Sequence, residues 1–230
     1  MARILLIETS TSVLSVALAV DGTVVAERIC REPRMQASLT APLVKEVLDE
    51  AGLKAPDCDA IAVSSGPGSY TGLRVGVSTA KGLAFGAGKP LIAVGTLDVL
   101  VDGCAERVMA DLDRPSFIVP MIDARRMEVY TAVYSAEGER LTEIESHIIG
   151  PDSFAPYLEK GTVLFVGDGA LKGKDVIKHP NARFEEAFPL ARHMAPRARK
   201  AFEEGKFENL AYFEPFYLKD FIPTTPKKLL

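Results

Sequence analysis

The sequence predicts an α/β protein built from two halves that repeat one order of elements. Each half opens with three strand-like segments and continues with helical and strand-like segments in alternation. Because 47% of the 230 residues are hydrophobic, the chain can fill one large core or two smaller ones. We place the boundary near residue 108, so that residues 1–108 form the first subdomain and residues 109–230 form the second.

Three antiparallel strands are expected at the start of the first half. Residues 4–7 form an apolar run, and residues 13–20 and 23–29 continue the strand-like pattern. Asp21 and Gly22 supply a hairpin turn between the last two strands.

Two helices alternate with two further strands in the rest of this half. Apolar residues at helical spacing predict a helix over residues 39–51, with Ser38 as its N-cap and Pro42 in its first turn. A second helix is expected at about residues 73–87. The strands before and after the second helix are expected at residues 60–63 and 91–94.

A helix over residues 96–108 leads into the second half, which repeats the order of the first. Its three strands are expected at residues 117–122, 127–134 and 141–149. A helix at residues 152–159 with Asp152 as its cap, a strand at residues 163–166 and a helix at residues 190–204 complete the half.

Composition limits the class of function. The net charge of −4 offers no basic surface for tight, independent binding of nucleic acid. Cys30, Cys58 and Cys104 are far apart and without CxxC spacing, which fits a reducing compartment and neither a disulfide framework nor a zinc site. No apolar run reaches the ~18 residues of a membrane helix, and the run at residues 4–7 is too short for a secretion signal. We therefore expect a cytoplasmic protein that does not span a membrane.

Catalytic motifs are not found in the sequence. The three histidines, His147, His179 and His193, form no HxxxH or HExxH motif and no cluster with a carboxylate, so we expect neither a metal site nor a Ser-His-Asp triad. The basic residues between Arg192 and Lys200 could contact RNA, although a solvated helix face is the favoured interpretation.

The loop at residues 64–72, Ser-Ser-Gly-Pro-Gly-Ser-Tyr-Thr-Gly, is the first candidate for phosphate binding. It lies between a buried strand and a helix, where Gly66 and Gly68 would let the backbone approach an anion and the start of the helix would favour negative charge. The loop lacks the Gly-Lys-Ser/Thr of a P-loop and the third glycine of a dinucleotide fingerprint. A tight turn shaped by glycine and proline is the alternative.

Two further loops are candidates for the same role. Glu8, Thr9 and Ser10 could hold a hydrated metal against a phosphate, and Gly167 and Gly169 could face an adenosine. A hydroxyl-rich turn is the alternative for the first loop, and a turn that needs positive φ is the alternative for the second.

The helix at residues 73–87 carries apolar or small side chains on nearly every face. One face can pack on the sheet, but the opposite face would lie in water unless something covers it. Gly76 and Gly82 each cost up to ~1 kcal/mol in a helix interior, and both would let another helix approach closely. With Val44 and Leu48 of the preceding helix, this surface could bury on the order of 800 Å² per partner. Coverage by the second subdomain is the alternative.

Three segments resemble the TsaB (YeaZ) family. They are residues 5–10, Leu-Leu-Ile-Glu-Thr-Ser; residues 65–76, Ser-Gly-Pro-Gly-Ser-Tyr-Thr-Gly-Leu-Arg-Val-Gly; and residues 121–130, Met-Ile-Asp-Ala-Arg-Arg-Met-Glu-Val-Tyr. The match runs over most of the chain. It implies a duplicated ribonuclease H-like, actin-like ATPase (ASKHA) fold with a mixed sheet flanked by helices in each subdomain.

The resemblance also implies a function. Members of the family are non-catalytic cytosolic subunits that work with the catalytic paralogue TsaD and the ATPase TsaE in threonylcarbamoyl transfer to a tRNA adenosine. It implies a homodimer when the chain is alone, contact with tRNA only through the complex, and no cofactor of its own, although a nucleotide could bind at the interface of the complex. The rival hypothesis is an ATP-dependent kinase or acyltransferase of the same superfamily, with phosphates at residues 66–72 and a hydrated magnesium near Glu8.

Two departures from the family weaken metal or nucleotide binding: Glu8 stands where relatives usually have Asp, and residues 35–38, Met-Gln-Ala-Ser, replace a His-containing stretch. By position, the resemblance implies a partner surface on the two helices of the first half. The residues expected there are Leu39, Leu43, Val44, Val47, Ser69, Thr71, Gly72, Arg74, Val75, Gly76, Thr79 and Leu83.

Overall fold

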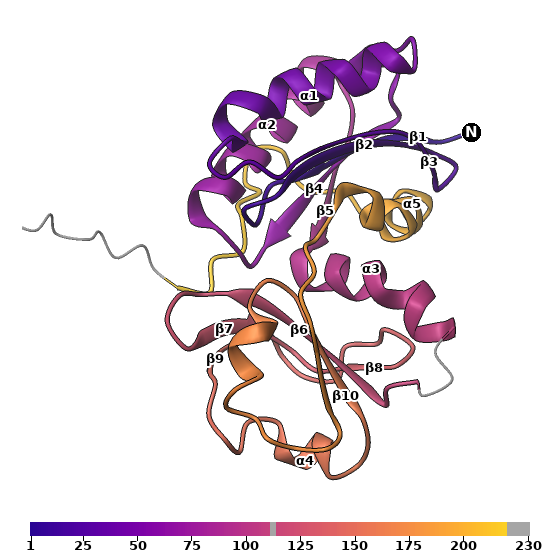
Figure 1. Cartoon of the computed structure of the whole chain (residues 1–230). Coiled ribbons are helices and arrows are strands. Elements are labelled where there is room, and N and C mark those ends of the chain that lie inside the picture. Colours follow the sequence, from indigo (N-terminus) through magenta and orange to yellow (C-terminus); the bar gives the residue numbers. More distant parts are fainter. Residues whose placement is uncertain (111–113, 220–230) are drawn as a thin grey trace, which may run out of the picture.

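The computed structural model describes residues 1–110 and 114–219, which form two lobes, each around a mixed β-sheet (Figure 1). The first sheet has the strand order β3-β2-β1-β4-β5. Its strands are β1 (Arg3–Glu8), β2 (Leu14–Val20), β3 (Thr23–Cys30), β4 (Ala60–Gly66) and β5 (Leu91–Gly95). β1 is antiparallel to β2 and parallel to β4, and β5 continues the parallel part.

The second sheet has the order β11-β10-β6-β7-β9. Its strands are β6 (Phe117–Asp123), β7 (Glu128–Thr131), β9 (Glu145–Ile148), β10 (Val163–Val166) and β11 (Ala182–Glu185), and β8 (Tyr134–Ser135) pairs with β6 outside this path. β6 is antiparallel to β7 and parallel to β10, as β1 is to β2 and β4. The second sheet thus repeats the first, and the predicted duplicated fold is confirmed.

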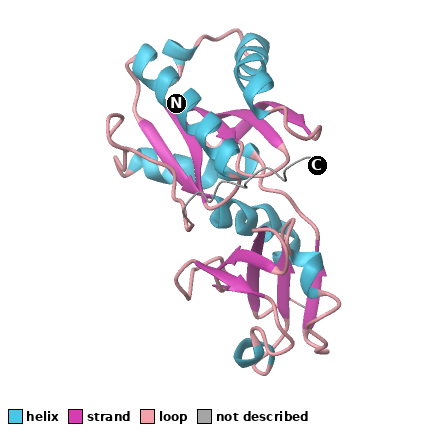
Figure 2. Ribbon diagram, turned by 90° about the vertical axis from the view of Figure 1, so that its left-hand side faces the viewer, coloured by secondary structure: helices cyan, strands magenta, loops and turns pink. Residues whose placement is uncertain are grey.

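Helices cover both faces of the first sheet (Figure 2). The helices α1 (Gln36–Glu50) and α2 (Tyr70–Ala87) pack on the face to which Leu5 and Ile7 of β1 point. Ile4 and Leu6 point to the opposite face, because successive side chains of a strand alternate. A strand buried on both faces is apolar throughout, which explains the uninterrupted run at residues 4–7.

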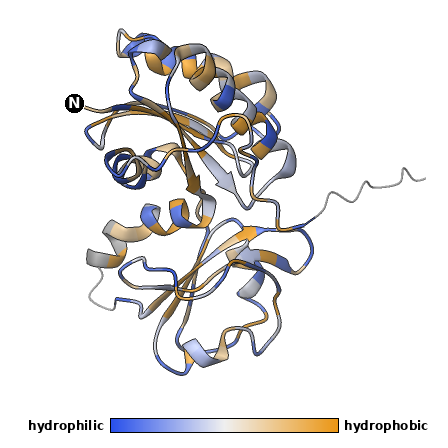
Figure 3. Cartoon of the chain, turned by 180° about the vertical axis from the view of Figure 1, so that it is seen from behind, coloured by the Kyte–Doolittle hydropathy of each residue, from blue (hydrophilic) through white to orange (hydrophobic). Residues whose placement is uncertain are grey.

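The opposite face of the first sheet is covered by residues from the end of the chain. The 3₁₀ turn η3 (Ala191–Met194) and α5 (Ala195–Glu203) pack there, and the Ala191 N–H donates a hydrogen bond of 2.8 Å to Ser15 Oγ of β2. Figure 3 shows the rest of α5 as largely hydrophilic. The expected second subdomain, residues 109–230, therefore does not describe the packing, because its last helix belongs to the core of the first lobe.

The helix α3 (Thr96–Ala110) departs from the expected division in the opposite sense. It was assigned to residues 1–108, yet Leu97 and Leu100 pack with Ile118 and Tyr134 of the second lobe. Two helices thus cross over between the sheets. Within the described residues, no helix is long and apolar enough to cross a membrane.

The first half follows the prediction except at two helix starts. α1 begins at Gln36 after Met35, so Ser38 lies inside the first turn instead of capping it, and Pro42 lies beyond the first turn. α2 begins at Tyr70, three residues earlier than expected. Between the helices lies a short 3₁₀ turn, η1 (Ala55–Asp57).

The second half differs more from the prediction. The strand expected at residues 127–134 is divided into β7 and β8, and the strand expected at residues 141–149 shrinks to β9. The helix expected at residues 152–159 is the single turn α4 (Ala155–Leu158), which follows Phe154 and not a capping Asp152. β11 was missed, and η2 (Ala170–Gly173) stands between β10 and β11.

Candidate functional site

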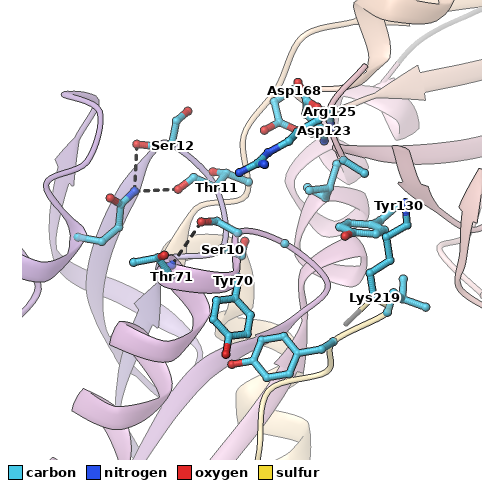
Figure 4. Close-up of a pocket in the computed structure, with 18 of the residues that line it drawn as sticks. Ser10, Thr11, Ser12, Tyr70, Thr71, Asp123, Arg125, Tyr130, Asp168 and Lys219 are labelled. Atoms are coloured by element: carbon cyan, nitrogen blue, oxygen red, sulfur yellow. Dashed lines mark hydrogen bonds between the residues drawn. The ribbon is translucent and has the colours of Figure 1, made fainter. Parts of the chain in front are cut away.

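A cleft of about 800 Å³ lies between the two lobes (Figure 4). The first lobe lines it with residues 10–12, which follow β1, and with residues 68–72 at the start of α2. The second lobe lines it with residues 122–125, Tyr130 and Asp168, and residues 216–219 from the end of the described chain close one side. The three loops that sequence analysis selected for phosphate binding thus meet around one cleft, although only Ser10 and Gly68 of the seven selected residues line it.

Glu8 is buried beneath the cleft and does not line it. Its Oε1 accepts hydrogen bonds from the Ser10 N–H (2.6 Å) and the Ser64 hydroxyl (3.0 Å), while its Oε2 is buried and has no hydrogen-bond partner among the described residues. Burial raises the pKa of the Glu8 carboxyl, and the hydrogen bonds from Ser10 and Ser64 only partly oppose this. The Glu8 carboxyl stabilises the loop after β1. Magnesium binding at Glu8 stays a prediction, and the buried orientation of this carboxyl does not favour it.

Thr9 holds the start of α2 against the loop after β1. Its Oγ1 donates a hydrogen bond of 2.8 Å to the Gly72 carbonyl oxygen. A Cβ at Gly72 would overlap the Thr9 carbonyl oxygen, and a Cβ at Gly76 would overlap Thr9 Oγ1. Both glycines are buried and let the helix approach its own lobe, so they are not available to another helix, contrary to the expectation for Gly76.

The other candidate glycines also lie where backbone segments come close. A Cβ at Gly68 would overlap the Ser10 carbonyl oxygen, and a Cβ at Gly66 would lie 2.7 Å from the Phe216 carbonyl oxygen. Gly167 adopts φ of +138° against the Met121 carbonyl oxygen, and a Cβ at Gly169 would lie 2.7 Å from a Val129 methyl carbon. Packing explains all four glycines, and phosphate binding by them stays a prediction.

Charged groups of the second lobe form the opposite wall of the cleft. The Asp123 N–H donates to Asp168 Oδ1 (2.9 Å), and Asp123 Oδ1 accepts from Lys172 Nζ and from the Arg125 N–H, each at 2.5 Å. Burial, together with the nearby Asp123 charge, raises the pKa of Asp168 to about 6. The Arg125 side chain extends into the cleft toward the first lobe (Figure 4).

The residues of this wall were not selected as site residues from the sequence, although residues 123–126, Asp-Ala-Arg-Arg, lie within the third segment that resembles the family. Arg125 and Arg126 have φ of +73° and +50°, which non-glycine residues seldom adopt. With the start of α2 opposite, the guanidinium of Arg125 makes the cleft suited to an anion.

A hydrogen-bonded chain of Glu145, His147 and Ser153 lies outside this cleft. His147 Nδ1 is 3.1 Å from Glu145 Oε1, and His147 Nε2 is 2.9 Å from Ser153 Oγ. The expectation that no histidine is grouped with a carboxylate was therefore wrong. Ser153 Oγ also accepts the Gly150 N–H (2.8 Å), and the residue is only 9% exposed, which indicates that it stabilises the turn before α4. Among the described residues, no group of three or more His, Cys, Asp or Glu is placed to hold a metal ion.

The outer face of α2 is exposed to solvent. Thr71, Arg74, Ser78, Gly82 and Phe85 recur every three or four positions and are all exposed, Phe85 by 80%. A Cβ at Gly82 would meet nothing within 4 Å. Neither the second lobe nor any other described part of the chain covers this face, as expected. The expectation that the face is apolar was wrong, because apart from Phe85 its exposed residues are polar or small, while Leu73 and Val77 are buried.

The expected partner surface is divided between this face and the core. Ser69, Thr71 and Arg74 are exposed, and Val75 and Thr79 are half-buried. The remaining members are buried or packed on the core of the first sheet: Leu39, Leu43, Val44, Val47, Gly72, Gly76 and Leu83. Val44 and Leu48, expected beside the core stripe of α1, are 4% and 6% exposed and belong to the core.

The basic residues of α5 and η3 are engaged in ion pairs. Arg197 binds Asp102 of α3 through two hydrogen bonds of 2.7 and 2.9 Å. Arg192 pairs with Glu27 of β3, and Arg199 pairs with Glu203. This arrangement favours the interpretation as a solvated, internally paired helix face over RNA binding.

The repeated sheets and the cleft between them define a duplicated α/β protein with the actin-like fold. A family model described as TsaD, tRNA N6-adenosine threonylcarbamoyltransferase, matches residues 34–226. The tRNA threonylcarbamoyladenosine biosynthesis protein TsaB of Escherichia coli is 34% identical over 226 residues, 95% of each chain, and that of Bacillus subtilis is 34% identical over 178 residues, 76% of this chain and 75% of its own. The solved structure of YeaZ from Pseudomonas aeruginosa superposes with a TM-score of 0.80 at 28% identity, covering 95% of this chain and all of the other.

The chain therefore belongs to the TsaB (YeaZ) family, within the wider family that the TsaD model describes. The resemblance noted from three sequence segments is confirmed.

Proposed function

We propose that this chain is a non-catalytic subunit of the cytoplasmic bacterial assembly that makes threonylcarbamoyladenosine in tRNA. Relatives named for that biosynthesis in Escherichia coli, Bacillus subtilis and Haemophilus influenzae support the pathway, since each matches at least three quarters of this chain. In this proposal the chain contacts tRNA only as part of the complex.

The uncovered outer face of α2 is the observation that carries the proposal of a binding role. Small and polar residues at helical spacing form, together with the large apolar side chain of Phe85, an exposed stripe in which Gly82 lets another helix approach closely. Arg74 near one end of the stripe and Phe85 at the other are residue types that are enriched in protein interfaces. The partner that we propose is TsaD, with TsaE joining the complex, and a second copy of this chain takes the same face when TsaD is absent.

The cleft supports a minor role for a small ligand. Arg125 and the start of α2 suit an anion, while Glu8, the acidic residue of the first loop, is turned into the core. We propose that the chain has no cofactor of its own and that a nucleotide binds only at the interface of the assembled complex.

Size-exclusion chromatography with light scattering tests the binding role. The purified chain is measured alone and mixed with TsaD and TsaE, beside the variant Gly82→Arg. Because Gly82 is open to solvent, this change leaves the monomer folded and places a long charged side chain in the middle of the stripe. We expect the variant to lose association with TsaD and with itself, while Glu159→Arg, an exposed change in the second lobe, behaves as the unchanged chain.

If the unchanged chain associates neither with TsaD nor with itself, the proposal is overturned. Calorimetric titration of the isolated chain with ATP and magnesium tests the rival hypothesis that the chain is itself an enzyme. Tight binding with steady turnover would favour an ATP-dependent kinase or acyltransferase.

A further inference from the structure

The last described segment of the chain first runs along the edge of the first lobe. The Glu208 N–H donates a hydrogen bond of 2.8 Å to the Leu91 carbonyl oxygen of β5. Leu210 and Phe213 then pack against the core beneath α1 and α2. Residues 208–213 are therefore anchored to the first lobe by both backbone and side chains.

The segment next runs along α2 toward the start of that helix. Lys81 Nζ donates to the Phe213 carbonyl oxygen (2.9 Å), and the Phe216 N–H donates to the Ser65 carbonyl oxygen at the end of β4 (2.7 Å). The absence of a side chain at Gly66 leaves room for the Phe216 backbone. These contacts bring the chain to the mouth of the cleft, which residues 216–219 line.

The end of the segment contacts both lobes. The Tyr217 ring packs against the Tyr70 ring, with centroids 4.9 Å apart. Lys219 Nζ forms an ion pair with Glu128 Oε2 of β7, and the hydrogen bond from Lys219 is the main cause that lowers the pKa of Glu128. Three residues of chain thus link the first turn of α2 to the sheet of the second lobe.

A second junction of the lobes lies across the molecule from this segment (Figure 1). There α3 and α5 are joined by the Arg197–Asp102 pair, which is partly buried and bonded at two points. A two-point guanidinium–carboxylate pair is stronger and more directional than a ring contact or an exposed ion pair. The α3–α5 junction is therefore the firm connection, and the contacts of residues 217–219 are the weak one.

We propose that residues 213–219 form a strap that holds the cleft closed. The lobes turn about the α3–α5 junction, and the cleft widens when Tyr217 leaves Tyr70 and Lys219 leaves Glu128. Because Tyr70 begins α2 and the Arg74 guanidinium lies 5.5 Å from the centre of its ring, the strap also connects the outer face of α2 with the cleft. This inference concerns the isolated chain and does not depend on the proposed function.

Electron–electron resonance distance measurement between two nitroxide labels tests the strap. The labels are attached to cysteines introduced at Lys45 of α1 and Glu159 after α4, both exposed and on different lobes. The background carries Cys30→Ser, because Cys58 and Cys104 are buried. The variant Tyr217→Ala with Lys219→Ala removes both contacts, and Tyr212→Ala is the control, since its ring is 82% exposed in the same segment.

We expect a longer-distance population in the double variant, with the ratio of closed to open molecules lowered by roughly five- to fiftyfold. The control is expected to match the unchanged chain. The same distance distribution in all three proteins would overturn the proposal. If the double variant does not fold, Lys219→Ala alone is the test. An open population that grows in Lys219→Ala, and in the unchanged chain when salt is raised, supports the strap. If neither change enriches the open population, the proposal is overturned.

Discussion

Two glycines of one helix, Gly76 and Gly82, have opposite surroundings. Gly76 faces the loop after β1, where a Cβ would overlap Thr9 Oγ1 and lie 3.2 Å from Thr9 Cβ. Gly82 faces solvent, where a Cβ would meet nothing within 4 Å. From the sequence, both glycines were expected to let another helix approach closely. In the structure only Gly82 can have this role, because the group that lies close to Gly76 is Thr9 of the same chain.

The difference separates the residues of α2 that hold the fold from those that are free for a partner. Buried small residues determine how near the helix lies to the sheet, so a change there alters folding. Exposed small residues cost helix stability without any packing gain in the monomer. The following predictions test this separation, beginning with the largest effect.

Gly76→Ala is expected to lower the free energy of unfolding by about 2–3 kcal/mol, because the added methyl group overlaps a buried, hydrogen-bonded hydroxyl. Urea unfolding followed by circular dichroism measures the change. Combining it with Thr9→Ala removes the overlapping oxygen, so the double variant should lose less than the sum of the two single variants. Strictly additive losses in the free energy of unfolding would show that the Thr9 side chain does not limit the size of the side chain at residue 76.

Glu8→Gln is expected to change how stability depends on pH. Burial raises the pKa of Glu8 above its usual 4.5, so the folded chain holds this proton more tightly than the unfolded chain. The contribution of Glu8 therefore favours folding below about pH 4.5 and is lost progressively as pH rises toward and through the folded pKa. Glutamine cannot lose a proton, so the difference in urea midpoint between variant and parent should grow in favour of the variant from pH 4 to pH 8. A difference that stays constant would contradict the burial of an ionisable carboxyl at this position.

Much of the fold could be predicted because its signals are local. The apolar run at residues 4–7 and the helical spacing over residues 39–51 are properties of neighbouring residues, and both elements were found near their expected places. β11 was missed because the alternation of apolar and polar residues in Ala-Arg-Phe-Glu covers only four residues, too few to indicate a strand, and the strand is held by its pairing with β10. The lobe to which η3 and α5 belong was missed because their packing depends on contacts such as that of Ala191 in η3 with Ser15, which is far away in the sequence.

The site was predicted less completely for the same reason. The glycine-rich segment at residues 64–72 was conspicuous, but sequence spacing does not show which backbone atoms lie opposite each glycine. The wall formed by Asp123, Arg125 and Asp168 depends on the meeting of two loops of the second lobe across a parallel strand pair. The strap at residues 213–219 carries no motif, and only its contacts reveal it.

Ser69→Ala is expected to lower the free energy of unfolding by about 1 kcal/mol. Ser69 is the N-cap of α2, and its Oγ accepts the Gly72 N–H at 3.3 Å, a donor that no carbonyl within the helix can satisfy. The comparison is Ser78→Ala, an exposed serine in the middle of the same helix, which should be neutral or slightly stabilising. Equal losses from both substitutions, measured by urea unfolding, would mean that Ser69 does not act as a cap.

Gly82→Ala should have the smallest effect and the opposite sign to Gly76→Ala. The methyl group has open space around it and restricts the unfolded chain, so the free energy of unfolding should rise by about 0.5–1 kcal/mol. The measurement is the same urea titration, made at a protein concentration low enough to keep the chain monomeric, because self-association would add its own stabilisation. A fall in stability there would mean that residue 82 is packed in the monomer, and the outer face of α2 would then no longer be free for a partner.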